Sequence, residues 1–297
     1  MKKLNGATFS RSDDSYTVHM LTSPAETFMS NAYLIESNNA VVAIDTLMLV
    51  SEAEAMRAYI AKIAKPLVAV FITHAHPDHY NGTATLLNGL GDVPVISTEG
   101  VSQCIAKVIT AKDTKWRPHF GDDWPRDILL PTRIVTDNSV LTFDGINYSI
   151  HELGPAESDS DLYIIVGNKK PVVFVGDVVF NQVHSFMNDG HSLLWLKSLD
   201  RLSSELKDIE LLFTGHGQPG ASLEVIEAQK NYLITYRREL SNLLASETQL
   251  TSLELKNSIE EKLSALFPNY DMIGFIAAGA NAVAAEIISA RLDSKTL

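Results

Sequence analysis

The stretch "FITHAHPDHYNG", residues 71–82, places three histidines and an aspartate within six positions, directly after an apolar run. His74 and His76 are two residues apart, so on an extended backbone their side chains project to the same side. The proline that follows interrupts regular structure and lets Asp78 and His79 turn in another direction. One short loop of this kind can supply ligands to two adjacent metal ions. With nine histidines in 297 residues, the cluster is improbable as a chance feature of a surface loop.

The residues before this stretch indicate where it lies in the fold. "PLVAVFIT", residues 66–73, is a continuous apolar run of strand length, typical of a strand buried on both faces. The histidine stretch therefore begins at the carboxyl end of a predicted strand. Upstream, apolar residues at helical spacing predict a helix over 51–64, with a capping-box pattern of Ser51 and Glu54 at its start.

Strand-like and helix-like segments alternate along the chain. Strands are predicted, with a hairpin turn at Asn38-Asn39, over residues 31–37, 40–47, 93–98, 140–145, 147–154, 161–168, 171–180 and 210–217. Further helices are predicted over 81–91, over 193–206 and from about Ala221 onward. The segment "TKWRPHFGDDWPRD", residues 114–127, has no clear period and is interpreted as a loop beside a cleft. We expect a layered α/β (α+β) fold, with a catalytic domain over 1–220 and a helical C-terminal extension packed on it over 221–297.

Composition limits the partners. The chain has 45% hydrophobic residues and a mean hydropathy of +0.04, so it can bury one large core. It carries 24 basic and 36 acidic side chains, a formal net charge of −12, and no basic cluster, so no nucleic-acid partner is expected. No run approaches ~18 apolar residues, so no membrane partner is expected. The lone Cys104 excludes an intrachain disulfide, and we expect a cytoplasmic location, although a signal peptide removed earlier would leave no trace.

Other ligand-type residues also follow predicted strands. Asp177 closes "VVFVGD" and His216 closes "LLFTGH", and neither is well explained by packing. Together with the histidine stretch they form three strand-terminal sets, which is what a metal centre at one edge of a sheet requires. Asp45 closes "AVVAID" and, taken alone, is interpreted as a strand-end cap.

"THAHPDHYNG", the "GD" at 176–177 and the "GH" at 215–216 together resemble the metallo-β-lactamase superfamily, including its glyoxalase II form Thr-His-x-His-x-Asp-His-x-x-Gly, over roughly residues 25–220. The resemblance implies an αββα sandwich of the metallo-β-lactamase type and a binuclear metal site. The implied ligands are His74 and His76 for a first metal, Asp78, His79 and His216 for a second, and Asp177 as the bridge between them. Asp45 matches an acid that supports the histidine loop from behind.

One position departs from the superfamily pattern. In "ELGPAESDSDL", residues 152–162, Glu157 stands where a histidine is usual. A carboxylate oxygen can bind zinc, and the alkylsulfatase branch of the superfamily resembles this chain in using a glutamate there. Asp159, Asp161 and His151 are alternative ligands. With this glutamate and the two aspartates bound, three carboxylates would face two dications, which weakens the Lewis acid and makes manganese or iron more competitive with zinc.

The resemblance implies metal-dependent hydrolysis. A hydroxide bridging two divalent ions ~3.5–4 Å apart, by expectation Zn²⁺ but with Mn²⁺ or Fe as alternatives, would attack a small-molecule ester, thioester, lactone or amide. Asp78 would position or deprotonate the attacking water. His184 and Phe186, in the segment after Asp177, are candidate substrate-binding residues.

Other functions remain open at this point. The main alternative is an iron-dependent, dioxygenase-like redox enzyme on the same fold. An alkylsulfatase-like sulfate ester hydrolase or a nuclease is less favoured, and a non-catalytic binding module is least favoured. The C-terminal helices could cover the active site, form the contact of a homodimer or pack as scaffold.

Overall fold

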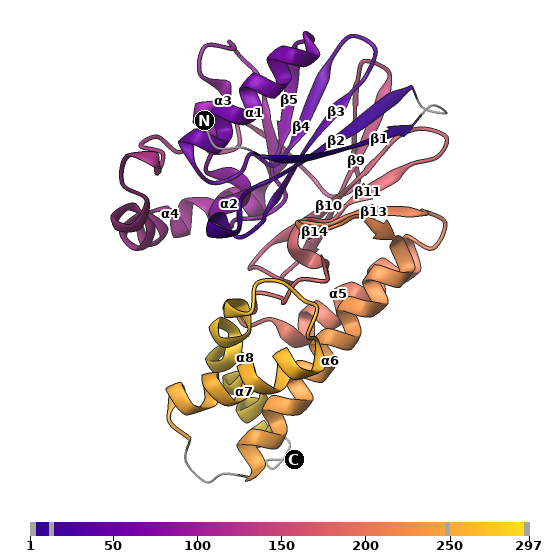
Figure 1. Ribbon diagram of the computed structural model, residues 1–297. Coiled ribbons are helices and arrows are strands. Elements are labelled where there is room, and N and C mark those ends of the chain that lie inside the picture. The colour runs from indigo at the N-terminus through magenta and orange to yellow at the C-terminus, as the bar shows by residue number, and fades with distance from the viewer. Residues whose placement is uncertain (1–3, 12–14, 247–249, 294–297) are drawn as a thin grey trace.

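Two facing β-sheets with helices on their outer faces form an αββα sandwich, followed by a helical C-terminal region (Figure 1). The computed structural model describes residues 4–11, 15–246 and 250–293. The first sheet contains, in spatial order, β1 (Asn5–Arg11), β2 (Tyr16–Thr22), β3 (Asn31–Glu36), β4 (Val41–Ile44), β5 (Leu67–Phe71), β6 (Val95–Thr98) and β7 (Arg133–Val135). The second contains β15 (Gly220–Ala221), β13 (Leu211–Phe213), β11 (Val172–Phe174), β10 (Asp161–Val166), β9 (Ile146–Gly154) and β8 (Ser139–Phe143). A short parallel pair, β12 (Phe180–Asn181) and β14 (His216–Gly217), lies outside both.

The first sheet changes from antiparallel to parallel at β4. The predicted hairpin is confirmed, because β3 and β4 pair antiparallel with Glu36 opposite Val41. From β4 to β7 the strands are parallel, and α1 (Val50–Ile63) makes the crossover between β4 and β5. The apolar run that precedes the histidine stretch is β5, which lies between two parallel neighbours as its composition predicts.

One helix prediction and one loop prediction need correction. The α1 helix begins at Val50, and Glu52 rather than Glu54 accepts the free backbone N–H groups of Met48 and Leu49 at its start. The segment over 114–127 was predicted as a loop, but residues 114–120 belong to α4 (Glu99–Phe120) and a 3-10 helix follows over Gly121–Asp123. The α4 helix contains a proline inside its last turn.

The remaining helices cover the two sheets. They are α2 (Pro77–Tyr80), α3 (Thr83–Leu87) and α5 (Ser192–Glu205), followed by the C-terminal α6 (Ser222–Ser246), α7 (Ser252–Leu266) and α8 (Gly274–Asp293). One apolar core fills the space between the sheets, with Phe71 stacked on Tyr148 across it. A second core joins the other face of the second sheet to α5–α8, so residues such as Val173 and Leu212 share a core with the C-terminal helices.

The α8 helix is unusually apolar. By length and composition, residues 274–292 are long and apolar enough to cross a membrane, so the expectation that no run approaches this length is wrong. In the structure 33% of the most apolar window is buried, and Ile276, Val283 and Ile287 belong to the second core. The α8 helix packs against α6 and α7, and the rest of that window is not buried in the structure.

Candidate metal centre

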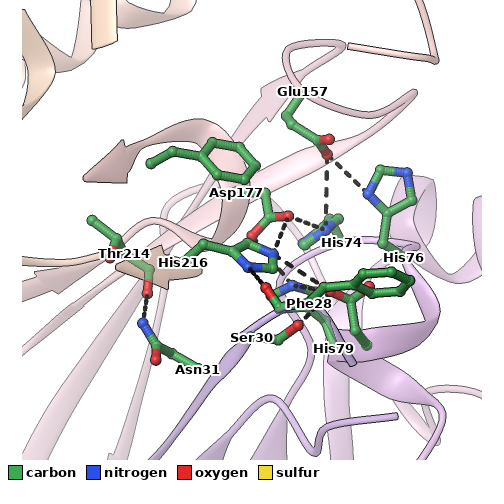
Figure 2. A network of polar contacts seen from close by, with 12 residues as sticks. Phe28, Ser30, Asn31, His74, His76, His79, Glu157, Asp177, Thr214 and His216 are labelled. Atoms are coloured by element: carbon green, nitrogen blue, oxygen red, sulfur yellow. Dashed lines mark hydrogen bonds and ion pairs between the residues drawn. The ribbon is translucent and has the colours of Figure 1, made fainter. Parts of the chain in front are cut away.

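The ends of β5, β9, β11 and β13 lie at one edge of the sandwich and bring together all seven predicted metal-ligating residues (Figure 2). They form two groups, within each of which the ligand-type atoms lie within 4.8 Å of one another. The first group is His74, His76, Glu157 and Asp177, and the second is Asp78, His79 and His216. All seven side chains are buried.

Asp45 holds the histidine stretch in place through polar contacts with Thr73 and His79. Its carboxylate accepts hydrogen bonds from the backbone N–H of Thr73 at 2.9 Å and from the Thr73 hydroxyl at 2.8 Å. It also lies 2.9 Å from Nδ1 of His79, which leaves Nε2 of that ring facing the cluster. Thr73 Oγ1 is in turn 2.9 Å from Nδ1 of His74. Asp45 therefore fixes the ring orientations, as its match to the superfamily motif implies.

The other two histidines are held by residues that the sequence analysis did not identify. The carbonyl of Phe28 lies 2.8 Å from Nδ1 of His216. Asp189 Oδ2 lies 3.1 Å from Nε2 of His76, so this ring presents Nδ1 to Glu157 instead. No local pattern marks Phe28 or Asp189, because each is far in sequence from the histidine that it contacts.

The distances between the groups identify Asp177 as the shared residue. In the first group, Glu157 Oε2 lies 3.0 Å from His76 Nδ1, and Asp177 Oδ2 lies 3.7 Å from His74 Nε2. Asp177 also faces the second group, with Oδ1 at 3.2 Å from His79 Nε2 and Oδ2 at 3.2 Å from His216 Nε2. It can therefore bridge two ions, which is the role that the resemblance implies.

The buried polar atoms test whether cations fit here. In the described part of the chain, five buried atoms make no aligned hydrogen bond and meet neighbouring ligand residues only at ion-pair distances: Nε2 of His74, Nε2 of His79, both carboxylate oxygens of Glu157, and Oδ1 of Asp177. Leaving a buried polar atom without a hydrogen bond costs about 1–3 kcal/mol, so these atoms, which belong to the two ligand groups, need cationic partners. Imidazole nitrogens and carboxylate oxygens converging on two points are the donor set that divalent ions require. The residues fit divalent metal ions, and each of the two groups could hold one.

The pKa shifts in the cluster also indicate that it attracts cations. Burial raises the pKa of Glu157 to about 8, against the opposing charge of His76. Burial alone would lower the pKa of His79, but the carboxylates of Asp177 and Asp78 outweigh it and raise that pKa well above its usual value. The buried carboxylates therefore attract positive charge, which divalent ions would supply by displacing protons.

The alternative ligands in the third motif lie elsewhere. Asp159 is partly exposed and pairs with Lys107 and His191, both at 2.9 Å. His151 lies 3.0 Å from the side chain of Asn138 and stacks on a tyrosine. Asp161 accepts hydrogen bonds from the backbone N–H groups of Ala156 and Ser158, on either side of Glu157. It thus holds the turn that points Glu157 into the cluster.

A cavity of about 330 Å³ opens over the two groups. Asp78 and His216 lie at its floor, and aromatic rings from α4 and α8, Trp116 and Phe275, lie in its walls. Phe186 lines it as predicted, with its ring centroid 5.5 Å from that of His76.

His184, the other candidate substrate residue, is placed differently. Its side chain is fully buried, lies 3.1 Å from the Tyr232 hydroxyl and is not among the residues that line the cavity. A larger and more open hollow of about 870 Å³ lies beside α1 and α3, but no metal-ligating residue lines it.

The profile of the metallo-β-lactamase superfamily matches residues 25–216, close to the extent of the resemblance in the sequence. The chain belongs to the metallo-β-lactamase superfamily. Solved structures of metallo-β-lactamases share this fold. One from Pontibacter korlensis has a TM-score of 0.62 and 16% identity, covering 78% of this chain and 99% of that one. One from Hirschia baltica has a TM-score of 0.58 and 18% identity, covering 78% and 98%.

Two curated relatives show how widely activities differ around this superfamily site. An alkyl/aryl-sulfatase of Saccharomyces cerevisiae, BDS1, is 23% identical over 282 residues, covering 80% of this chain and 43% of the relative. A probable RNase of Methanocaldococcus jannaschii, MJ4, is 26% identical over 171 residues, covering 49% and 40%. The chain thus spans less than half the length of either relative, and the superfamily alone does not define the substrate.

Proposed function

We propose that this chain is a metal-dependent hydrolase with two divalent ions, by expectation zinc, that cleaves a small-molecule ester, thioester, lactone or amide. The observation that carries the proposal is the pair of buried ligand groups sharing Asp177 at the floor of a cavity of about 330 Å³. A cavity of this size accommodates a small molecule. The presence of two ligand groups also favours a binuclear hydrolase over a mononuclear iron dioxygenase, because the dioxygenase needs a single metal site.

The side chains at the floor have distinct tasks in such a reaction. Bound divalent ions would supply an acidified water as nucleophile and a Lewis acid for the developing oxyanion. Asp78 lines the cavity, and its Oδ2 accepts a hydrogen bond from Ser30 Oγ at 2.5 Å, so its carboxylate is held where it can orient a water or accept its proton. Asp189 fixes the His76 ring, and the aromatic walls limit the access of bulk water.

Sulfate ester hydrolysis is the second candidate. Two observations favour it. Glu157 occupies the third-motif position, where the alkylsulfatase branch also has a glutamate, and a curated relative is named as an alkyl/aryl-sulfatase. Carbonyl esters stay first because the match covers only 43% of that relative.

The test combines metal content with a small substrate panel. We expect about two zinc or manganese equivalents per chain, by mass spectrometry on protein purified without added metal or chelator. The panel is 4-nitrophenyl acetate, phenyl thioacetate, a homoserine lactone and 4-nitrophenyl sulfate, with Asp78→Asn as the inactive control. Turnover of the sulfate alone would select the second candidate. A single iron with oxygen consumption would overturn both.

A further inference from the structure

Two lysines of α4 line the cavity that lies over the metal centre. Lys112 and Lys115 are three residues apart, and Trp116 follows on the same face of the helix. All three belong to the cavity lining, whereas Lys107, earlier on the same helix, does not. The helix therefore presents two positive charges and one aromatic ring to the space above the metal centre.

Among the described residues, neither lysine forms a direct ion pair, although the charge of Lys112 acts on Asp189 and helps to lower the pKa of that carboxylate. Within the described ranges, neither ammonium lies within 4.0 Å of a carboxylate, whereas Lys107 pairs with Asp159 at 2.9 Å. The Lys115 ammonium instead lies 4.6 Å from the centroid of the Trp116 ring. Partial burial and the neighbouring charge of Lys112 both lower the pKa of Lys115, so the two ammonium groups repel each other. In a chain of net charge −12, these two adjacent lysines place local positive charge in the lining of the cavity.

The rest of the cavity wall is aromatic. The ring of Phe28 lies with its centroid 5.5 Å from Trp116 and 5.7 Å from Phe275. Phe275 is in turn 5.4 Å from Phe186. These rings form a continuous apolar wall from α4 to α8. The cavity thus has three chemically different parts: a metal-binding floor, an apolar wall and a positively charged side.

We infer that Lys112 and Lys115 form an anion-binding subsite, so that the substrate is an ester-type molecule with an apolar part and a separate negatively charged group, such as a carboxylate. The substrate assignment rests on the proposed function, whereas anion binding does not require turnover. Lysine ammonium groups are point charges that accept a carboxylate in many orientations. The side chains of the metal-binding floor include three carboxylates, so among the side chains that line the cavity the lysine pair is the source of positive charge remote from the metals.

Binding tests the subsite without turnover. The probes are 4-phenylbutyrate and 4-phenyl-1-butanol, which share an apolar tail and differ in charge, titrated calorimetrically into the metal-loaded protein. We expect the acid to bind at least about tenfold more tightly than the alcohol, and the double variant Lys112→Gln/Lys115→Gln to lose most of that preference. Lys62→Gln removes the same charge from the surface of α1 and should leave it unchanged. If the double variant kept the same preference for the acid over the alcohol as the unchanged protein, the carboxylate would bind at the metals and the subsite would be overturned.

Turnover then separates the subsite from the proposed function. 4-Nitrophenyl acetate and the mono-4-nitrophenyl ester of glutaric acid have the same leaving group, and only the second carries a carboxylate. We expect the double variant to lower kcat/KM about tenfold for the charged ester and less than about twofold for the neutral one. If neither ester reacts but the lysines still control binding of the acid, the ester hydrolase fails and the subsite stands. If both react and the variant affects them equally, the subsite fails.

Discussion

At the scale of single residues, Glu157 determines the charge of the first ligand group. Replacing it with alanine should remove about one of the two metal equivalents, because the first group keeps only His74, His76 and the shared Asp177. Glu157→His restores an imidazole donor and should retain both, with a stronger bias toward zinc. Metal analysis of the purified variants measures this. If Glu157→Ala retained both ions, Glu157 would not be a ligand.

Gly215 is a second residue on which the metal centre depends. A Cβ at this position would overlap Oδ1 of Asp177 and lie 2.8 Å from the carbonyl carbon of Gly176. Gly215→Ala should therefore displace the shared carboxylate, lower the metal content and destabilise the fold by about 1–3 kcal/mol. Metal analysis and urea unfolding report the two effects. Gly6→Ala in β1, whose Cβ would meet only ordinary contacts, should change neither.

Six of the seven ligand positions could be predicted from sequence because they lie in the compact histidine motif or at a strand end, whereas Glu157 was indicated only by the resemblance to the superfamily. Their supporting residues were not. Ser30 lies 48 positions from Asp78, which it contacts. Phe28 lies 188 positions from His216, and Asp189 lies 113 positions from His76. Only the folded sheet edge brings such distant positions together, and serine, phenylalanine and aspartate carry no local signal for it.

At the scale of elements, most strands and helices were predicted because their apolar patterns are regular, and the failures occur where tertiary contacts decide. The sequence over 114–127 lacks a period, yet α4 continues to Phe120 because Arg117 binds Asp113 one turn earlier at 2.6 Å and Trp116 packs beside Phe28. The hairpin of β1 and β2 was not predicted at all. The exposed face of β1 leaves it without a strong alternating pattern.

The position of α8 against the cavity can be tested through Gly279. Its Cβ would lie 2.7 Å from Cβ of Met187, in the segment that also carries Phe186 and Asp189. Gly279→Ala should push this segment and α8 apart, costing about 1–2 kcal/mol of unfolding free energy and loosening the cavity wall. Urea unfolding and the KM of the best substrate would measure it. At Gly274, near the start of α8, an added Cβ would have no atom within 4 Å. A similar loss of unfolding free energy in Gly274→Ala would therefore contradict the packing argument.

At the scale of the whole molecule, two cores meet at the second sheet. The core between the sheets fixes the strand ends that carry the ligands, and the second core ties the same sheet to α5–α8. The cavity wall combines the second core, through Phe275 of α8, with a small third cluster around Trp124, on which Trp116 of α4 packs. The C-terminal helices were predicted to be helical, but their share in the cavity wall could not be deduced from an apolar pattern alone.

The stability of this joint structure should depend on pH through His184. The ring is fully buried beside Tyr232, and the His184 backbone N–H donates to the carbonyl of Asp271 before α8. Burial lowers the pKa of His184 to about 4, from a usual value of 6.5. Between these values the unfolded chain binds more protons than the folded one, so stability is fully present above pH 6.5 and is lost as pH falls toward 4, by about 1–3 kcal/mol. His184→Gln removes the titration, so the free energies of unfolding of the two proteins should converge as pH falls from 7 to 4.5. Loss of metal at low pH affects both alike and cancels in the difference, so a difference that stays constant over this range would show that the His184 pKa is not lowered in the folded protein.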